Sequence, residues 1–147
     1  MCSRKPLDTA KSEIRLLKLS SRVSSPLISC HLKVFNLQDK PKYDALSYVW
    51  GSTEEDLKEI KLDGAKFAVT KNLHDALTTL RVMHWTQPFW VDALCINQAD
   101  PQERSHQVGI MDNIYAGASQ VVVFLNNARF PGNPEKKTEQ LCSVPRR

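Results

Sequence analysis

A strand ends and a helix begins within residues 89–107, FWVDALCINQADPQERSHQ. The first residues are apolar up to the carboxylate of Asp92, as at the end of a short strand. Asp100 can cap the following helix with its side-chain oxygen, and Pro101 fits the first helical position, where an N–H would have no partner. Glu103 occupies the position of a capping-box carboxylate. This stretch therefore predicts a strand followed by a helix.

Residues 93–99, ALCINQA, connect that strand to that helix. They contain two adjacent polar residues with carboxamide side chains and little of the chemistry that favours a tight turn. In open parallel sheets, ligands bind beyond the carboxyl ends of the strands. We therefore expect a functional site at this point of the chain.

Hydrophobic patterns predict further strands on both sides of this stretch. Asp63-Gly64 is a favoured two-residue hairpin turn, and the apolar run VVVFL is typical of a strand covered on both faces. The first two strands are expected to pair as another hairpin. The predicted strands cover residues 14–19, 28–34, 43–50, 60–62, 67–69, 89–92 and 121–125.

Two helices are predicted. The first covers residues 72–83, with Asn72 as its cap, Asp75 in the capping-box position and one apolar stripe. The second runs from Pro101 to about Ala116 and is expected to bury Val108 at least in part. Its interior Gly109 indicates close packing of the backbone against a neighbour, because glycine weakens a helix by about 1 kcal/mol relative to alanine.

The order of elements from Tyr43 to Leu125 is strand, helix, strand, helix, strand, with a hairpin inserted before the first helix. Such alternation predicts an α/β fold with a doubly wound, mostly parallel sheet and right-handed crossovers. We expect an N-terminal tail over residues 1–13 and a domain over 14–126 with its core motifs at 43–125. Residues 127–147 lack apolar periodicity and are expected to be a disordered or degenerate tail.

Composition narrows the class of protein. The net charge of +4 arises from basic residues that are spread along the whole chain and partly balanced by acidic clusters. A nucleic-acid-binding surface normally needs basic residues concentrated on one face, so it is not expected. The polar N-terminus and the lack of a long apolar run predict a cytoplasmic protein without a membrane span. The four cysteines, Cys2, Cys30, Cys95 and Cys142, lack zinc-site spacing, so we expect reduced thiols and no metal.

Three blocks of the chain resemble the fungal heterokaryon incompatibility (HET) domain. They are YDALSYVWG at 43–51, TKNLHDALTTLR at 70–81 and FWVDALCINQADPQERSHQVGIMDNIYAGASQVVV at 89–123. Their order and spacing match that family over about eighty residues, which is far more specific than one motif. The resemblance implies a module that triggers or transmits regulated cell death when non-self is sensed after fungal cells fuse.

The same blocks are similar, more remotely, to the TIR domain, which implies a TIR-like doubly wound sheet. TIR domains assemble through their faces, and some cleave NAD with a glutamate on the helix after the last of these strands. This chain departs there, because Val123-Phe124-Leu125-Asn126 stands where HET domains usually end in tryptophan-leucine-glycine. Glu135 and Glu139 follow, but we assign the catalytic role to neither.

The candidate site combines residues from two strand ends and one helix start. Asp92 can bind a ribose hydroxyl or cap local N–H groups, and the structural role is favoured. Asn97 and Gln98 suit a nucleotide or a fixed loop equally well. The full set of candidates is Trp50, Gly51, Asp92, Asn97, Gln98, Glu103 and Arg104, with Arg104 able to reach a phosphate or a partner's carboxylate.

These residues leave three functions open. The first is a HET-type module that acts mainly through protein partners or self-association, without a cofactor. The second is an enzyme that cleaves NAD or another nucleotide in the crevice. The third is an inactive truncated relic. No catalytic residue is assigned.

Overall fold

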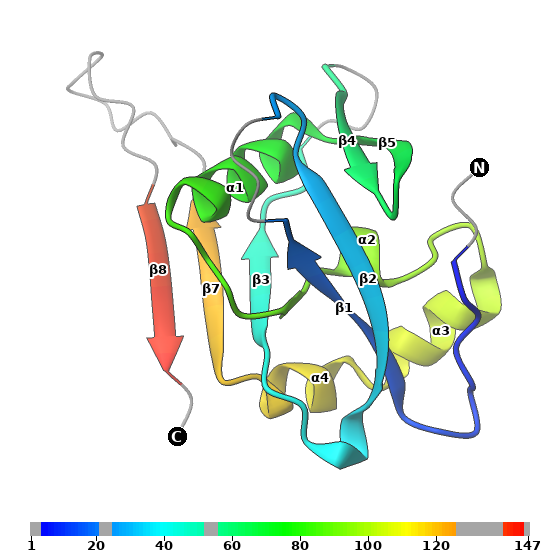
Figure 1. Ribbon diagram of the computed structural model, residues 1–147. Coiled ribbons are helices and arrows are strands. Elements are labelled where there is room, and N and C mark those ends of the chain that lie inside the picture. Colours follow the sequence, from blue (N-terminus) through cyan, green and yellow to red (C-terminus); the bar gives the residue numbers. More distant parts are fainter. Residues whose placement is uncertain (1–3, 21–24, 52–55, 126–139, 146–147) are drawn as a thin grey trace.

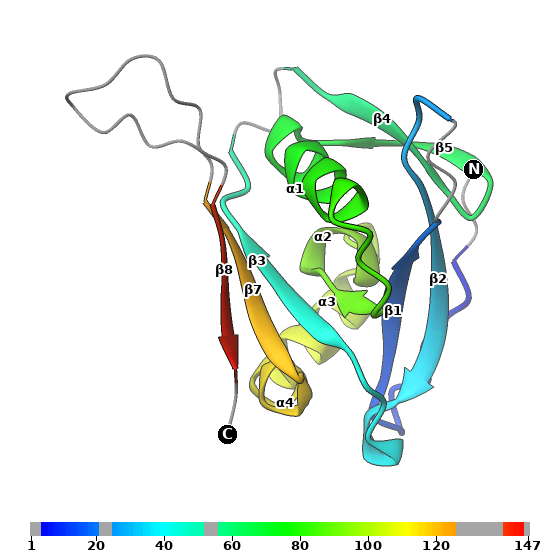
Figure 2. The same ribbon diagram turned by 60° about the vertical axis from the view of Figure 1, so that its left-hand side comes forward.

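The computed structural model describes residues 4–20, 25–51, 56–125 and 140–145. These residues form an eight-stranded sheet with helices on both faces (Figures 1 and 2). The strands are β1 (Glu13–Leu19), β2 (Ser29–Asn36), β3 (Asp44–Tyr48), β4 (Lys58–Leu62), β5 (Ala65–Val69), β6 (Phe89–Trp90), β7 (Gln120–Leu125) and β8 (Gln140–Pro145). The helices are α1 (Lys71–Val82), α2 (Asp92–Cys95), α3 (Pro101–Gly109) and α4 (Met111–Gly117), with a 3-10 turn at Leu37–Asp39.

The sheet is mixed, in the order β5-β4-β2-β1-β6-β3-β7-β8. Its centre, β6-β3-β7, is parallel as the sequence predicted, and β2 and β4 are also parallel. The pairs β1–β2, β1–β6, β4–β5 and β7–β8 are antiparallel. The α/β class and both inserted hairpins are thus confirmed, whereas the parallel arrangement is confined mainly to the centre.

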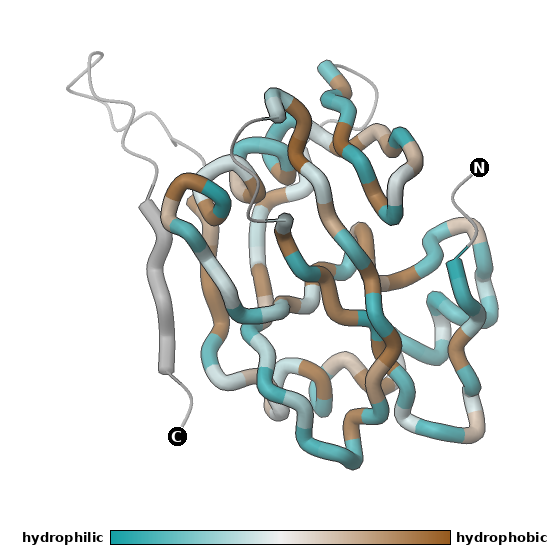
Figure 3. The backbone as a smooth tube through the Cα atoms, in the orientation of Figure 1, coloured by the Kyte–Doolittle hydropathy of each residue, from teal (hydrophilic) through white to brown (hydrophobic). Residues whose placement is uncertain are grey.

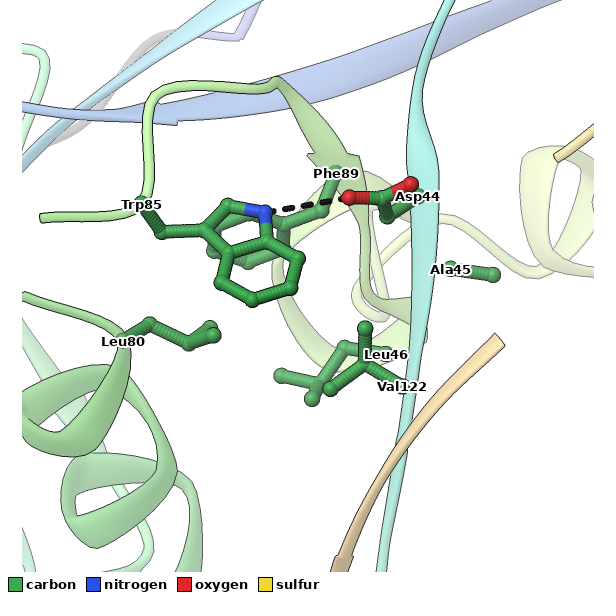
Figure 4. Close-up of a pocket in the computed structure, with 7 residues that line it drawn as sticks. All are labelled: Asp44, Ala45, Leu46, Leu80, Trp85, Phe89 and Val122. Atoms are coloured by element: carbon green, nitrogen blue, oxygen red, sulfur yellow. Dashed lines mark hydrogen bonds between the residues drawn. The ribbon is translucent and has the colours of Figure 1, made fainter. Parts of the chain in front are cut away.

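The two crossovers around β3 place helices on opposite faces of the sheet (Figures 1 and 2). On one face, Leu80 of α1 lines a closed space with Leu46 and Val122 (Figure 4). On the other face, the hydroxyl of Tyr43 donates to the carbonyl of Ile114 in α4, at 2.5 Å. Successive side chains of an extended segment point to opposite faces of the sheet. Tyr43, directly before β3, and Leu46, within it, therefore pack against helices on opposite faces.

Apolar residues concentrate on the strands. Figure 3 shows a largely hydrophobic β7 and a largely hydrophilic α3. In β7, Val122 and Phe124 are buried while their neighbours are partly or fully exposed, so the strand is covered less completely than its continuous apolar run predicted. No helix in the described part of the chain is both long and apolar enough to cross a bilayer.

The hairpin between β4 and β5 turns at the predicted dipeptide. Asp63 and Gly64 have φ angles of 51° and 81°, as a type I′ turn requires. Other boundaries differ from the prediction. β3 stops at Tyr48, and β6 has only two residues, so Asp92 opens α2 and does not end a strand.

The cap of helix α1 lies two residues earlier than predicted. Thr70 is its cap, and its Oγ1 accepts the N–H of Leu73 at 3.3 Å. Asn72 was predicted for that role, but its amide donates to the carbonyl of Val49 at 2.9 Å. The predicted apolar stripe is confirmed in four of its members, while Met83 is exposed.

The predicted helix over 101–116 is two helices, α3 and α4, which are separated at Ile110. The cap is confirmed, because Asp100 Oδ1 accepts the N–H groups of Gln102 and Glu103 at 3.0 and 3.2 Å. Two packing expectations were wrong. Val108 is exposed, and nothing lies within 4 Å of where a Cβ on Gly109 would stand.

Replacing Gly109 with alanine is therefore expected to stabilise the protein by about 0.4–1 kcal/mol, because it restricts the unfolded chain without meeting a neighbour. Gly117→Ala is the matched control, since its Cβ would lie 3.0 Å from the hydroxyl of Tyr43. Denaturant unfolding measures both. A loss of stability in Gly109→Ala, equal to that in Gly117→Ala, would contradict the open environment of Gly109.

Both predicted tails contain ordered structure. Leu7 is buried, and the guanidinium of Arg4 donates to the carbonyl of Ile96 at 2.6 Å, so residues 4–12 pack onto the domain. Residues 140–145 form β8 along the edge of β7, where the sequence predicted disorder. Glu135, like the rest of the stretch up to residue 139, lies outside the described residues, as do residues 146–147.

Candidate functional site

The structure brings together two of the predicted site residues at the carboxyl ends of β3 and β6. These strands are parallel neighbours, so the residues that follow them meet at one edge of the sheet. There the indole Nε1 of Trp50 donates to Asp92 Oδ2 at 3.2 Å. This hydrogen bond confirms that the side chains of Trp50 and Asp92 lie together, as predicted from their positions after two neighbouring strands, β3 and β6.

Asp92 has a local structural role at the start of α2. Its Oδ1 accepts the N–H of Ala93 at 2.7 Å. Burial raises the pKa of the Asp92 carboxyl, and the hydrogen bonds from Ala93 and Trp50 offset part of that rise. Burial disfavours the charged form of a carboxyl group, whereas N–H donors favour it.

The two carboxamides hold the loop that follows α2. Gln98 Nε2 donates to the backbone carbonyl of Asp92 at 3.0 Å. Asn97 Oδ1 accepts the N–H of Ala99 at 3.2 Å, which is the geometry of an Asx turn. Of the two roles that the sequence left open, these contacts correspond to the fixed loop.

Glu103 forms a buried ion pair with Arg15 of β1. Both guanidinium ends take part, since Arg15 Nη1 contacts Glu103 Oε1 and Nη2 contacts Oε2 at 3.1 Å. The side chain of Glu103 also accepts the N–H of Asn97 at 2.8 Å. Glu103 therefore does not act as the capping-box carboxylate, because its oxygens are directed to Arg15 and to the loop.

Arg15 connects three distant segments. Besides Glu103, it donates to the carbonyls of Cys95 at 3.0 Å and Lys5 at 2.7 Å. The sequence analysis missed this residue. The signal was an arginine inside the strand IRLLKL, in which four consecutive residues from Ile14 to Leu17 prove to be buried. A strand buried on both faces has no solvent-facing position for a charged side chain, so such an arginine needs an internal partner.

Arg104 does not join the other candidates, because its side chain is exposed. Gly51 lies beside Trp50 and has a φ of 72°, a conformation that L side chains rarely adopt. A Cβ on Gly51 would lie 2.7 Å from Asn72 Nδ2. Glycine is thus required here by the backbone and by the close approach of α1.

Gly51→Ala is expected to cost more stability than Gly64→Ala. Both residues have positive φ, which costs about 1–2 kcal/mol for an L residue, but nothing lies within 4 Å of a Cβ on Gly64. Only Gly51→Ala also displaces the amide of Asn72. Urea midpoints of the two variants test this, and Asn72→Ala should relieve part of the Gly51→Ala defect. Equal losses for the two glycines would contradict the contact.

Two tyrosines near Asp92 were not among the predicted site residues. Burial raises the pKa of both Tyr48 and Tyr115, and the negative charge of Asp92 adds to each rise. The ring of Tyr115 also meets Trp90 edge to face, with centroids 5.5 Å apart. Asp92 therefore bonds to one aromatic side chain, Trp50, and its charge acts on two others, Tyr48 and Tyr115.

A hollow of about 280 Å³ lies at the other end of the sheet, near the amino ends of β3 and β7. The buried carboxylate of Asp44 adjoins it and accepts Trp85 Nε1 and Gln87 Nε2, each at 3.1 Å. Figure 4 shows the indole of Trp85 directed at Asp44 above the closed apolar space. These contacts fix the connection from α1 to β6.

The thiols of Cys30 and Cys95 are free and buried, as expected. Burial raises the pKa of each to about 12, so neither is a ready nucleophile at neutral pH. Within residues 4–20, 25–51, 56–125 and 140–145, no three His, Cys, Asp or Glu side chains gather as a metal site would require.

These features define a mixed α/β domain in which a buried arginine–glutamate pair holds the loop beyond the central strands. The chain belongs to the heterokaryon incompatibility protein (HET) family, whose sequence model matches residues 43–143. The match contains the three blocks quoted above and extends past residue 126, where the sequence analysis ended the domain.

One curated relative is heterokaryon incompatibility protein 6, OR allele, of Neurospora crassa. It is 37% identical over 137 residues, which cover 83% of this chain and 20% of that protein. The chain thus spans about a fifth of the length of the relative that it matches. No solved structure matches the chain.

Proposed function

We propose that this chain is a HET module that acts in fungal non-self recognition and regulated cell death, mainly through protein assembly in the cytoplasm. Family membership and the name of the Neurospora crassa relative support the biological role. One structural observation carries the choice of assembly. The polar groups that would have to bind a nucleotide are occupied by contacts within the domain.

Those contacts account for most of the predicted crevice. Gln98 bonds to the backbone of Asp92, Asn97 closes a turn, and Glu103 pairs with Arg15. A ligand that recruited these groups would have to break hydrogen bonds already made inside the domain. The cost is largest at Glu103, because leaving the buried guanidinium of Arg15 without its partner costs about 3–5 kcal/mol.

The same edge of the sheet exposes apolar side chains. Val49, Trp50 and Leu125 have exposed fractions of 63%, 39% and 49%. Tyr48 pairs with Phe124, so Val49, which follows β3, and Leu125, the last residue of β7, lie at the same edge of the sheet. We call Val49, Trp50 and Leu125 the edge patch. Exposed apolar patches favour association with another protein.

A relationship to TIR domains is part of this proposal. It is supported by the parallel centre β6-β3-β7 with α1 on one face and α4 on the other. TIR domains assemble through their faces, and the proposed assembly follows that comparison. The antiparallel outer strands are additions to such a centre.

Inducible expression in a filamentous fungus tests the proposed function. The wild-type chain is expected to kill hyphal cells, as measured by uptake of a vital dye. Val49→Ser with Leu125→Ser should abolish killing, whereas Val108→Ser should not, because Val108 is equally exposed but lies on α3. Immunoblots and thermal melts must show that all variants accumulate and fold. Absence of killing by the wild-type chain would favour the inactive relic.

The enzymatic alternative leads to a separate prediction. Purified chain incubated with NAD should release no more nicotinamide than a heat-killed control, because Asn97, Gln98 and Glu103 are bound internally. Liquid chromatography of the products measures the release. Turnover above the control that disappears in Asp92→Ala, but persists in Arg104→Ala, would establish the enzyme in place of the assembly module.

A further inference from the structure

The carboxylate of Asp92 has no cationic partner in the described part of the chain. Its oxygens accept N–H groups from Ala93 and from the indole of Trp50, and the backbone N–H of Asp92 itself also stabilises the charged form. The ion pairs of the described residues involve other carboxylates, and the buried cation Arg15 is paired with Glu103. An ionised carboxylate offers about four lone-pair sites, so these contacts leave room for a donor from outside.

The surroundings of this carboxylate are aromatic and apolar. Trp50 is partly exposed and bonded to it, while Tyr48 and Tyr115 lie within reach of its charge. Val49 and Leu125 of the edge patch are exposed, and they directly follow the paired residues Tyr48 and Phe124. The site therefore combines a desolvated negative charge, a partly exposed indole and an apolar rim.

We propose that the edge patch and Asp92 together dock an arginine side chain, flanked by apolar residues, of a partner protein. The inference rests on the proposed assembly function and names the chemistry of the partner. A guanidinium is planar and weakly hydrated, stacks on tryptophan and donates N–H groups in a fork that matches a carboxylate. The negative charge of Asp92 disfavours an anionic partner, such as a phosphate.

The occupant is assigned to another protein because most described arginines are already engaged. Arg4 bonds to the carbonyl of Ile96, Arg15 to Glu103 and Arg81 to the carbonyls of Ser25 and Leu27. Arg104 is exposed, so docking of a second copy through Arg104 is an outcome that the experiment distinguishes.

The indole N–H signals of the three tryptophans provide the test. The probe is the blocked tripeptide Leu-Arg-Leu, titrated into the 15N-labelled chain. The signal of Trp50 should shift in a saturable way, while those of Trp85, bonded to Asp44, and Trp90, fully buried, should not. The same tripeptide with neutral citrulline in place of arginine should bind at least tenfold more weakly.

Variants separate the charge from the apolar contacts. Asp92→Asn keeps an oxygen for the N–H of Ala93 but removes the charge, so it should weaken the arginine peptide at least tenfold and leave the citrulline peptide unchanged. Val108→Ser should bind like the wild-type chain. Equal binding of both peptides, or no shift at millimolar peptide, would overturn the inference. Dimerisation lost in Arg104→Ala would assign the site to a second copy and also overturn it.

The killing and peptide-binding experiments distinguish an error in the arginine site from an error in the proposed function. If the wild-type chain and Asp92→Asn kill hyphal cells equally, the arginine site is wrong and the assembly module stands. If the peptide binds as expected and the wild-type chain does not kill, the site is right and the proposed function is wrong.

Discussion

Glu103→Ala is expected to lower the free energy of unfolding by about 3–5 kcal/mol, the typical cost of removing one partner from a buried ion pair. The side chains of Arg15 and Glu103 are only 2% and 7% exposed. Without the carboxylate, the guanidinium keeps two backbone acceptors but no negative charge, and the N–H of Asn97 loses its acceptor. Equilibrium urea unfolding followed by circular dichroism measures the loss.

Two controls isolate the cause. Arg104→Ala alters the next residue on the exposed side of the same helix and should change stability by less than about 0.5 kcal/mol. Arg15→Met combined with Glu103→Leu should be more stable than Glu103→Ala, because well-packed apolar residues can replace a buried ion pair. The buried pair would be refuted as a structural element if Glu103→Ala were as mild as Arg104→Ala.

Leu77→Ala is expected to cost about 2–5 kcal/mol, because it leaves a cavity in the core. Leu77 has an exposed fraction of 0% and belongs to the buried stripe of α1 with Leu73, Ala76 and Leu80. Asp100→Ala is the comparison, since losing a helix cap costs about 0.5–2 kcal/mol. Guanidinium midpoints should place Leu77→Ala well below Asp100→Ala. The opposite order would contradict the assignment of the buried face.

The elements that the sequence predicted well are those encoded by adjacent residues. The turn at Asp63-Gly64 and the cap at Asp100 each depend on a few neighbouring side chains. Local backbone geometry determines such features, so they can be predicted from one amino-acid sequence. The cap at Thr70 was not predicted, because asparagine is also a favoured cap residue and Asn72 was chosen instead. In the structure the amide of Asn72 bonds to the carbonyl of Val49, a contact that the local sequence does not reveal.

Features that depend on distant segments were not predictable in this way. The position of β1 between β2 and β6 buries Arg15, and no pattern near residue 15 names Glu103 as its partner. β8 has no apolar periodicity and becomes a strand by pairing along β7. The break at Ile110 follows a glycine, which the sequence analysis had attributed to close packing.

Which of the candidate site residues lie together could be predicted in part. Trp50 and Asp92 meet because residues after parallel neighbouring strands must share one edge, which is a rule of topology. The roles of Asn97, Gln98 and Glu103 depend on which acceptor each side chain finds. Carboxamides and carboxylates suit both ligands and loops, so residue type alone leaves that choice open.

The central position of β1 in the sheet also affects how the protein folds during its synthesis. Arg15 and Glu103 are 88 residues apart, so at about 5–20 residues per second a ribosome adds the glutamate roughly 4–18 s after the arginine. Until β6 is synthesised at residues 89–90, β1 has only β2 as a partner in the sheet, and an isolated hairpin is marginally stable in water. The apolar face of this hairpin is exposed to chaperones during synthesis. The complete sheet can form only after the ribosome has passed α3.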